Sequence, residues 1–129
     1  MTMPEPQPLQ EEAHAYMKRR DWAGAIPFLD RDILQHPSDM WSRIYLGICH
    51  MNLKNFDVAL EHFRAAESLA PGDSRPVGCR GDLLCATGDW EAAGEFYRRA
   101  LEMNPDGELA IKNWNWWKSE MAKDLPSDE

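Results

Sequence analysis

The chain has 129 residues, a formal net charge of −8 and 43% hydrophobic residues. This length suits about one domain. The acidic charge argues against nucleic acid or an anionic membrane as the main partner, because both attract clusters of lysine and arginine. If charge steers a partner to this chain, that partner is locally basic.

The start of the chain and its cysteines bear on the cell compartment. The first ten residues, MTMPEPQPLQ, lack the basic and apolar regions of a signal peptide. No stretch reaches the roughly 18 consecutive apolar residues of a membrane span. The three cysteines, Cys49, Cys79 and Cys85, contain no CxxC pair, which favours free thiols in a reducing compartment. We therefore expect a cytoplasmic protein.

The chain begins with a proline-rich stretch and a first pair of helices. Residues 1–8 hold three prolines and no hydrophobic periodicity, which indicates a flexible lead-in. A helix is predicted from Leu9 to Arg19, and a second helix begins near Trp22 after a polar turn. Pro27 lies about one turn inside this second helix, where the missing amide hydrogen is tolerated near a helix start.

The central stretch, Met40 to Pro71, shows two helical patterns separated by a short polar break. Its first helix, Met40 to Leu53, is apolar on two faces, so it must meet two partners. Its second helix, Phe56 to Leu69, has a single apolar stripe with charged residues opposite. The two predict a helical hairpin with one additional neighbour.

The remaining chain predicts one more hairpin, a final helix and a tail. Residues 74–107 form the hairpin, and residues 108–123 form a helix that covers the last apolar face. Residues 124–129 are polar and are expected to be disordered. In the final helix, Ile111, Trp114, Trp117 and Met121 are predicted to face inward. Trp116 points roughly 200° away from Trp114 on a helix, so it is predicted to face outward.

The same residue types recur along the chain at a constant interval of 34 residues (56 − 22 and 90 − 56). Four columns of the sequence keep this interval without an insertion. They are Trp22, Phe56 and Trp90; Ala25, Ala59 and Ala93; Leu29, Phe63 and Tyr97; and Pro37, Pro71 and Pro105. A small-residue column, Ala13, Gly47 and Gly81, lets paired helices approach closely. Turn residues Asp21, Asn55 and Asp89 precede the aromatics and suit helix N-caps.

A period of 34 residues with these columns resembles the tetratricopeptide repeat (TPR) family. The resemblance implies an all-α, right-handed superhelix of three hairpins, with repeats at about residues 6–39, 40–73 and 74–107 and a capping helix at 108–123. The whole TPR domain is expected to span residues 9–123. Asp32 departs from the pattern, because the equivalent positions hold Ala66 and Ala100. We expect Asp32 to be partly exposed, or paired with Arg31 or a donor on a neighbouring helix.

The third repeat also departs from the second at two positions. Arg80 stands where Leu46 packs, and Gly94 stands where Leu60 packs. We expect the Arg80 stem to pass along the core while its charged end reaches the surface.

The resemblance also implies a binding site, because the first helices of TPR repeats line a concave groove that holds a peptide or helix of a partner. Carried onto this sequence, the partner-binding groove consists of Gln10, His14, Met17, Trp41, Ile44, Tyr45, Ile48, Asn52, Arg75, Cys79, Asp82, Lys112, Asn113 and Trp116. Its apolar and aromatic centre suits a hydrophobic anchor.

The centre of this groove can be described further. Leu46, Gly47 and Leu53 suffice to pack the central helix on its hairpin mate. Ile44 and Ile48 are therefore predicted to form the groove floor, with Tyr45 offering a hydroxyl and Trp41 walling one side. The alternative is that this face belongs to the core or to a dimer contact.

Some TPR proteins bind the C-terminal carboxylate of chaperones through a clamp of Lys, Asn and Arg. The matching positions here hold Gln10, His14, Tyr45 and Cys79, and only Arg75 is basic. The sequence therefore argues against binding of a chaperone tail, which needs two basic groups.

Catalytic and metal sites are not indicated. Cys49 and His50 are adjacent on a helix and point about 100° apart, so they cannot act on each other as nucleophile and base. The histidines His14, His50 and His62 are scattered without the spacing of metal ligands. The sequence thus predicts no enzyme, no metal and no cofactor.

The functional expectation is a protein-interaction module: an adaptor, an assembly factor or a small chaperone that binds a peptide or helix of a locally basic partner with an apolar anchor. The alternative is a structural protein that self-associates, for instance as a homodimer, through Trp41 or Trp116. Neither nucleic acid nor a membrane is expected as a partner. The identity of the client is left open.

Overall fold

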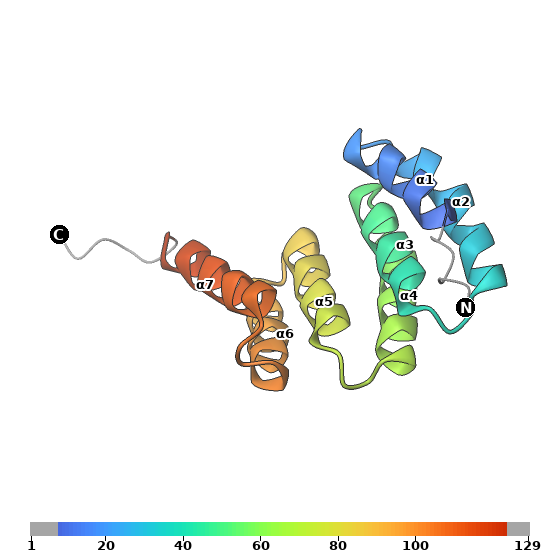
Figure 1. Ribbon diagram of the computed structural model, residues 1–129. Helices are drawn as coiled ribbons and strands as arrows, with labels where there is room; N and C mark the ends of the chain where they lie inside the picture. Colours follow the sequence, from blue (N-terminus) through green and yellow to red (C-terminus); the bar gives the residue numbers. More distant parts are fainter. Residues whose placement is uncertain (1–7, 124–129) are drawn as a thin grey trace. The chain divides into compact units, whose positions relative to one another are not determined.

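The computed structural model describes residues 8–123, and its regular structure in this range is helical throughout (Figure 1). The helices of the described range are α1 (Pro8–Lys18), α2 (Trp22–Gln35), α3 (Met40–Asn52), α4 (Phe56–Leu69), α5 (Ser74–Thr87), α6 (Trp90–Met103) and α7 (Glu108–Lys123). The chain divides into two compact units, residues 1–69 with α1–α4 and residues 70–129 with α5–α7. The predicted all-α fold is confirmed.

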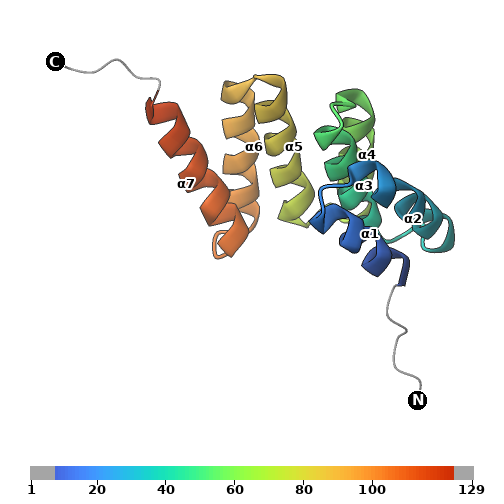
Figure 2. The same ribbon diagram turned by 90° about the horizontal axis from the view of Figure 1, so that it is seen from above.

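Within each unit, helices that follow one another in the chain pack together. In the first unit α1 contacts α2, α2 contacts α3, and α3 contacts α4. In the second unit α6 contacts both α5 and α7, and Figure 2 shows these three helices in chain order. Each predicted hairpin is therefore present, and α7 covers the last of them.

The predicted ends of the domain need one small correction. Pro8, which was assigned to the lead-in, is the first residue of α1, in keeping with the tolerance for proline in a first helical turn. The rest of the predicted lead-in, and the predicted tail at 124–129, lie outside the described residues. Between residues 8 and 123, no helix has both the length and the apolarity to cross a membrane.

Each hairpin turns at the same place in the 34-residue period. Arg20, Lys54 and Gly88 all have a positive φ, of 60°, 66° and 91°. The residue after each of them donates its backbone N–H to the carbonyl five residues back, at 2.8–2.9 Å. The carboxylates of Asp21 and Asp89 accept hydrogen bonds from the backbone N–H three residues on. The predicted caps at these two positions are confirmed, and they start α2 and α6.

Close helix contact explains the small residues in the repeat. A Cβ atom added to Gly47 would lie 2.3 Å from the Phe63 ring, and one added to Gly81 would lie 2.7 Å from the Tyr97 ring. Both rings are fully buried side chains of the paired helix. The aromatic rings of the paired helix therefore fill the space that the two glycines leave open, a pairing that the sequence pattern did not predict.

The core of the first unit joins three helices. Its buried residues are Ala13 of α1, Ala25 and Leu29 of α2, and Leu46 and Cys49 of α3. Burial raises the pKa of the Cys49 thiol to about 11. Cys49 is therefore a packing residue, as expected, and its thiol is not activated.

Asp32 is more deeply buried than predicted. Its side chain is only 1% exposed, so the expectation of partial exposure is wrong. The carboxylate accepts hydrogen bonds from Ser42 of α3 and from Gln10 of α1 at 3.1 Å, and it lies 3.1 Å from Nδ1 of His36. Donors on neighbouring helices satisfy it, which was the other expectation, whereas Arg31 is exposed. This polar cluster ties α1, α2 and α3 together.

The predicted inward face of α7 is right at Trp117 and wrong at Ile111, and the predicted Trp114 and Met121 are partly buried. Ala110 is buried, whereas Ile111 is 39% exposed. Trp117 is the anchor: its ring fills the space beside Gly94, and its Nε1–H donates to the Trp90 carbonyl at 2.8 Å. Gly94 replaces the leucine of the preceding repeat because the large Trp117 ring needs that space.

The outward prediction for Trp116 is only partly right. Its side chain is 43% exposed, but its ring lies 5.7 Å from that of Trp90 and 6.4 Å from that of Tyr97. Arg80 is partly exposed. Its guanidinium lies over the Phe96 ring, 4.4 Å from the ring centre, so the charge stays at the edge of the core.

Candidate functional site

The predicted groove residues of the first unit include an aromatic cluster. Tyr45 of α3 lies between two other rings. The His14 ring of α1 meets it edge-on at 4.5 Å, and the Trp41 ring stacks on it at 5.7 Å. All three side chains are partly exposed. The structure therefore brings these three predicted residues together into one surface, the aromatic cluster of the first unit.

Other predicted groove residues of the first unit are structural. Gln10 donates its amide N–H to the buried polar cluster around Asp32, and Met17 packs against the core. Ile44 is only 3% exposed, so its assignment to an open groove floor is wrong. Ile48 is partly exposed, and the exposed Asn52 donates its side-chain amide to the Ile48 carbonyl.

The reason for this correction is the packing of α3. This helix contacts both α2 and α4, so two of its faces are covered within the first unit. Leu53, expected to pack the hairpin, is instead 38% exposed, whereas Tyr45 packs against the core of the first unit. Packing within the unit therefore explains the apolar residues of α3 that join this core, namely Leu46, Cys49 and Tyr45.

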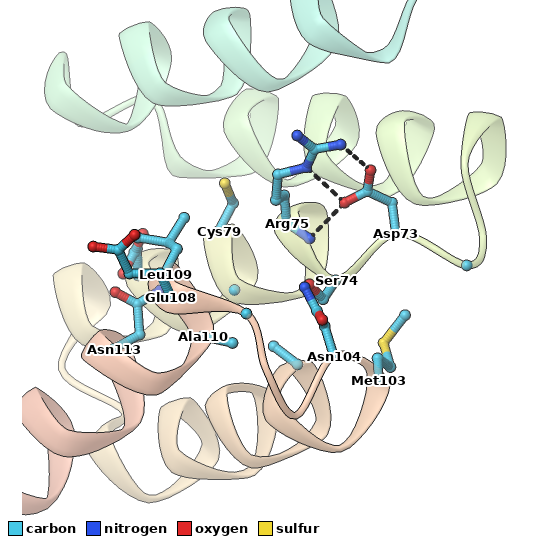
Figure 3. Close-up of a pocket in the computed structure, with 15 residues that line it drawn as sticks. Asp73, Ser74, Arg75, Cys79, Met103, Asn104, Glu108, Leu109, Ala110 and Asn113 are labelled. Atoms are coloured by element: carbon cyan, nitrogen blue, oxygen red, sulfur yellow. Dashed lines mark hydrogen bonds and ion pairs between the residues drawn. The ribbon is translucent and has the colours of Figure 1, made fainter.

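The second unit contains a pocket of about 560 Å³ between α5, α7 and the turn after α6 (Figure 3). Four predicted groove residues line it, namely Arg75, Cys79, Asp82 and Asn113. The first three lie four and three residues apart on α5, which places them on one face of the helix. Of the two remaining predicted residues, Lys112 is exposed on α7, and Trp116 rests against α6.

Arg75 is held at the rim of this pocket by Asp73. The Asp73 carboxylate caps α5 by accepting the Arg75 backbone N–H at 2.9 Å, and it also accepts the Arg75 Nε–H at 2.8 Å. A second guanidinium N–H completes a bidentate pair, which Figure 3 shows as dashed lines. Hydrogen bonds from Arg75 lower the pKa of Asp73. The only basic side chain predicted for the clamp is thus already matched by a carboxylate.

Asp82 lies in the same pocket with a different partner. Its carboxylate accepts a hydrogen bond from the Tyr97 hydroxyl of α6. Burial raises the pKa of Asp82, and the Tyr97 hydrogen bond opposes this only in part. Burial and nearby carboxylates also raise the pKa of Cys79 to about 12, so its thiol stays protonated at neutral pH.

Several pocket residues were missed by the sequence reasoning. Gly78, Asn104, Glu108 and Leu109 come from three different segments, and no repeat column marks them. Gly78 carries a signal that could have been used, because a glycine inside a helix outside the small-residue column needs a reason. A Cβ atom there would meet only Asn113, at 3.4 Å, so Gly78 leaves the pocket open rather than allowing a helix contact.

The described residues offer no metal site. Between residues 8 and 123, no three His, Cys, Asp or Glu side chains lie close enough together to hold an ion. His50 stacks on His62 at 5.6 Å, and neither forms a ligand set with Cys49, which is buried on another face.

Comparisons with known proteins agree with the repeat pattern. Two tetratricopeptide repeat family models match residues 11–74 and 81–110. A curated relative, superkiller protein 3 of Schizosaccharomyces pombe, is 27% identical over 77 residues. The match covers 60% of this chain but only 6% of that protein, so the chain spans a small part of its relative.

Solved structures share the fold over most of the chain. The Sgt2 TPR domain from Aspergillus fumigatus has a TM-score of 0.77 at 18% identity, covering 98% of this chain and 89% of that one. The first TPR domain of human RPAP3 has a TM-score of 0.76 at 23% identity, covering 89% and 91%. The first TPR of Spaghetti (RPAP3), solved with the HSP90 peptide SRMEEVD, has a TM-score of 0.74 at 23% identity, covering 88% and 93%.

Proposed function

Because the chain belongs to the tetratricopeptide repeat family, we propose that it acts by binding a segment of another protein, as an extended peptide or a helix. The observation that carries this proposal is the 560 Å³ pocket of the second unit, whose volume lies in the range of ligand pockets. Helices α5, α6 and α7 all contribute to its walls. The aromatic cluster of the first unit offers a separate anchor surface for the same partner or another.

The bound segment is proposed not to be an acidic chaperone tail. Some proteins of this fold bind such tails, since the Spaghetti domain was solved with the peptide SRMEEVD. Here the pocket lining holds three carboxylates, those of Asp73, Asp82 and Glu108, against the single guanidinium of Arg75. A peptide carboxylate would meet repulsion in this pocket rather than a basic clamp. An adaptor, assembly factor or small chaperone for a neutral or basic segment, acting in the cytoplasm, fits these features better.

A selection from a random peptide library displayed on phage tests the proposal. We expect binders whose dissociation constants, measured by fluorescence anisotropy, fall at or below about 100 µM, the range of weak peptide recognition. Their binding should shift the backbone amide NMR signals of the pocket or of the aromatic cluster. Binders that shift neither region, or a selection without binders, would refute the proposal.

The alternative function is self-association, and α7 carries the observation that favours it. Leu109, Ile111 and Trp116 are 56%, 39% and 43% exposed on this helix. Light scattering at two protein concentrations separates the two functions, because a self-associating chain gains mass with concentration. A mass that stays at one chain across the range would remove this alternative.

A catalytic function is not proposed. Burial raises the pKa of Cys49, Cys79 and Cys85 alike, which makes all three thiols poor nucleophiles at neutral pH. Replacing Cys49 and Cys85, which lie outside the pocket lining, by alanine should therefore leave peptide binding in place.

A further inference from the structure

The pocket of the second unit has a charged interior and an apolar mouth. Asp82 of α5 lies among its lining residues, together with the polar side chains of Asn104 and Asn113. Met103 and Leu109 also line it, and they are 39% and 56% exposed. Figure 3 shows Met103 and Leu109 at opposite ends of the pocket, so a side chain that enters beside Leu109 would need an apolar stem to cover Leu109 and a polar end to reach Asp82.

Asp73 and Asp82 differ in the charge of the side chain that hydrogen-bonds to each of them. Asp73 forms a bidentate pair with Arg75, which satisfies both charges at the rim. Asp82 instead accepts a hydrogen bond from the Tyr97 hydroxyl, which is a neutral group. Burial raises the pKa of Asp82, so the fold itself disfavours the ionised form there. A carboxylate kept at such a position suits a cation supplied from outside.

Gly78 keeps the approach to Asp82 open. It stands on α5 one turn before Asp82, and no side chain projects from it into the pocket. An added Cβ would meet only the Asn113 amide nitrogen, at 3.4 Å, which is an ordinary contact distance. Helix stability would favour alanine at this position, so the glycine is explained by the space that it leaves.

We propose that this pocket takes a lysine or arginine side chain of the partner segment, with the Asp82 carboxylate as its charge partner. This inference rests on the proposed function, because it names what enters the same pocket. The aliphatic stem of the cation lies along the exposed Leu109, and the amide of Asn113, which Figure 3 shows at the same end of the pocket, hydrogen-bonds the partner's backbone. The surplus of carboxylates around the pocket steers such a segment toward it.

The test uses a matched pair of capped heptapeptides, Gly-Ser-Leu-Arg-Leu-Ser-Gly and the same peptide with citrulline in place of arginine. Citrulline keeps the shape of arginine without its charge. Each peptide is titrated into the full chain, and amide NMR signals are followed. We expect the arginine peptide to shift the signals of Gly78, Cys79 and Asp82 and to bind at least about tenfold more tightly than the citrulline peptide.

The variant Asp82→Asn separates binding from folding. The asparagine carbonyl can still accept the Tyr97 hydrogen bond, and the buried charge is removed. Its melting temperature should therefore equal or exceed that of the natural chain. The arginine peptide should lose at least about tenfold in affinity, to the level of the citrulline peptide. Glu91→Gln, at an exposed position outside the pocket, is the matched control for the loss of one charge and should bind normally.

Either of two affinity results would overturn the cation assignment. One is equal affinity for the two peptides, and the other is unchanged affinity of Asp82→Asn for the arginine peptide. If both peptides shift the pocket signals equally, the proposed binding function survives while the cation assignment fails. If neither peptide shifts these signals up to millimolar concentration, the cation assignment fails, and the phage selection decides separately whether the chain binds peptides elsewhere.

Discussion

The first unit holds a buried aspartate, Asp32, and the second a partly buried one, Asp82, and their surroundings shift the two pKa values in opposite directions. Asp32 in the first unit accepts hydrogen bonds from Ser42 and Gln10 and contacts His36; burial alone would raise its pKa, but these contacts together lower it. Asp82 in the second unit has its pKa raised by burial, and the Tyr97 hydroxyl offsets this only partly. Hydrogen bonds within the fold favour the ionised form of Asp32, so its role is structural. The fold disfavours the ionised form of Asp82, so that carboxylate is better explained by a ligand.

The largest effect should come from removing the satisfied aspartate. Asp32→Ala leaves the donors of Gln10 and Ser42 buried without their acceptor, so it should lower the free energy of unfolding by about 3–5 kcal/mol. Urea denaturation followed by circular dichroism measures this loss. Asp82→Asn under the same conditions should show no loss in the free energy of unfolding. The two aspartates would then differ clearly in their contribution to stability.

The pH dependence of the stability difference between the natural chain and Asp32→Ala provides a further check. Because the pKa of Asp32 is lowered in the folded state, its stabilisation is present above its unfolded pKa of about 3.9. It is lost as pH falls through the folded pKa. The gap between the natural chain and Asp32→Ala should therefore narrow only in acid. If the two free energies of unfolding converge well above the pH range of acid titration, the charge of the Asp32 carboxylate is not what stabilises the polar cluster.

The next effect concerns the apolar anchor of the second unit. Trp117→Ala removes the ring beside Gly94 and the hydrogen bond to the Trp90 carbonyl, and it should cost about 3 kcal/mol. Trp116→Ala should cost about 1 kcal/mol, because that ring is 43% exposed. Thermal unfolding of the two variants compares them. Equal losses would mean that α7 turns a different face toward α6.

Replacing one glycine in each unit by alanine should change the stability of the chain in opposite directions. Gly47→Ala places a Cβ 2.3 Å from the present position of the Phe63 ring and should destabilise the chain by about 1–3 kcal/mol. Gly78→Ala has room and should stabilise it by about 0.5–1 kcal/mol while narrowing the pocket. Chemical denaturation gives both values. A destabilised Gly78→Ala variant would show that this glycine serves packing rather than an opening.

The smallest effect lies in the hairpin turns. Lys54 in the first unit and Gly88 in the second occupy the same turn position with φ of 66° and 91°. Lys54→Gly should stabilise by about 0.5 kcal/mol, and Gly88→Ala should destabilise by about 1 kcal/mol, since only glycine adopts this backbone freely. Differential scanning calorimetry of the two variants measures both shifts. Shifts of the same sign would argue that the two turns are not equivalent.

The sequence by itself determined the repeating part of this protein. The 34-residue spacing predicted the helices, the turns and the small residues at Gly47 and Gly81 where paired helices pack. These features depend on contacts between helices that are adjacent in the chain, so local spacing is enough to specify them. The resemblance to TPR proteins predicted Arg75, Cys79 and Asp82 as groove residues, and all three line the pocket from α5.

Only the tertiary structure decided what each of those residues does. The depth of Asp32 depends on donors 10 and 22 residues away, in α3 and α1. The faces of α3 are covered by its contacts with both α2 and α4, and Ile44 is buried against expectation. The pocket joins residues from α5, α6 and α7, and Gly78 matters in it for the space that it leaves. Burial and empty space are properties of packed helices, and no periodicity along a single helix records them.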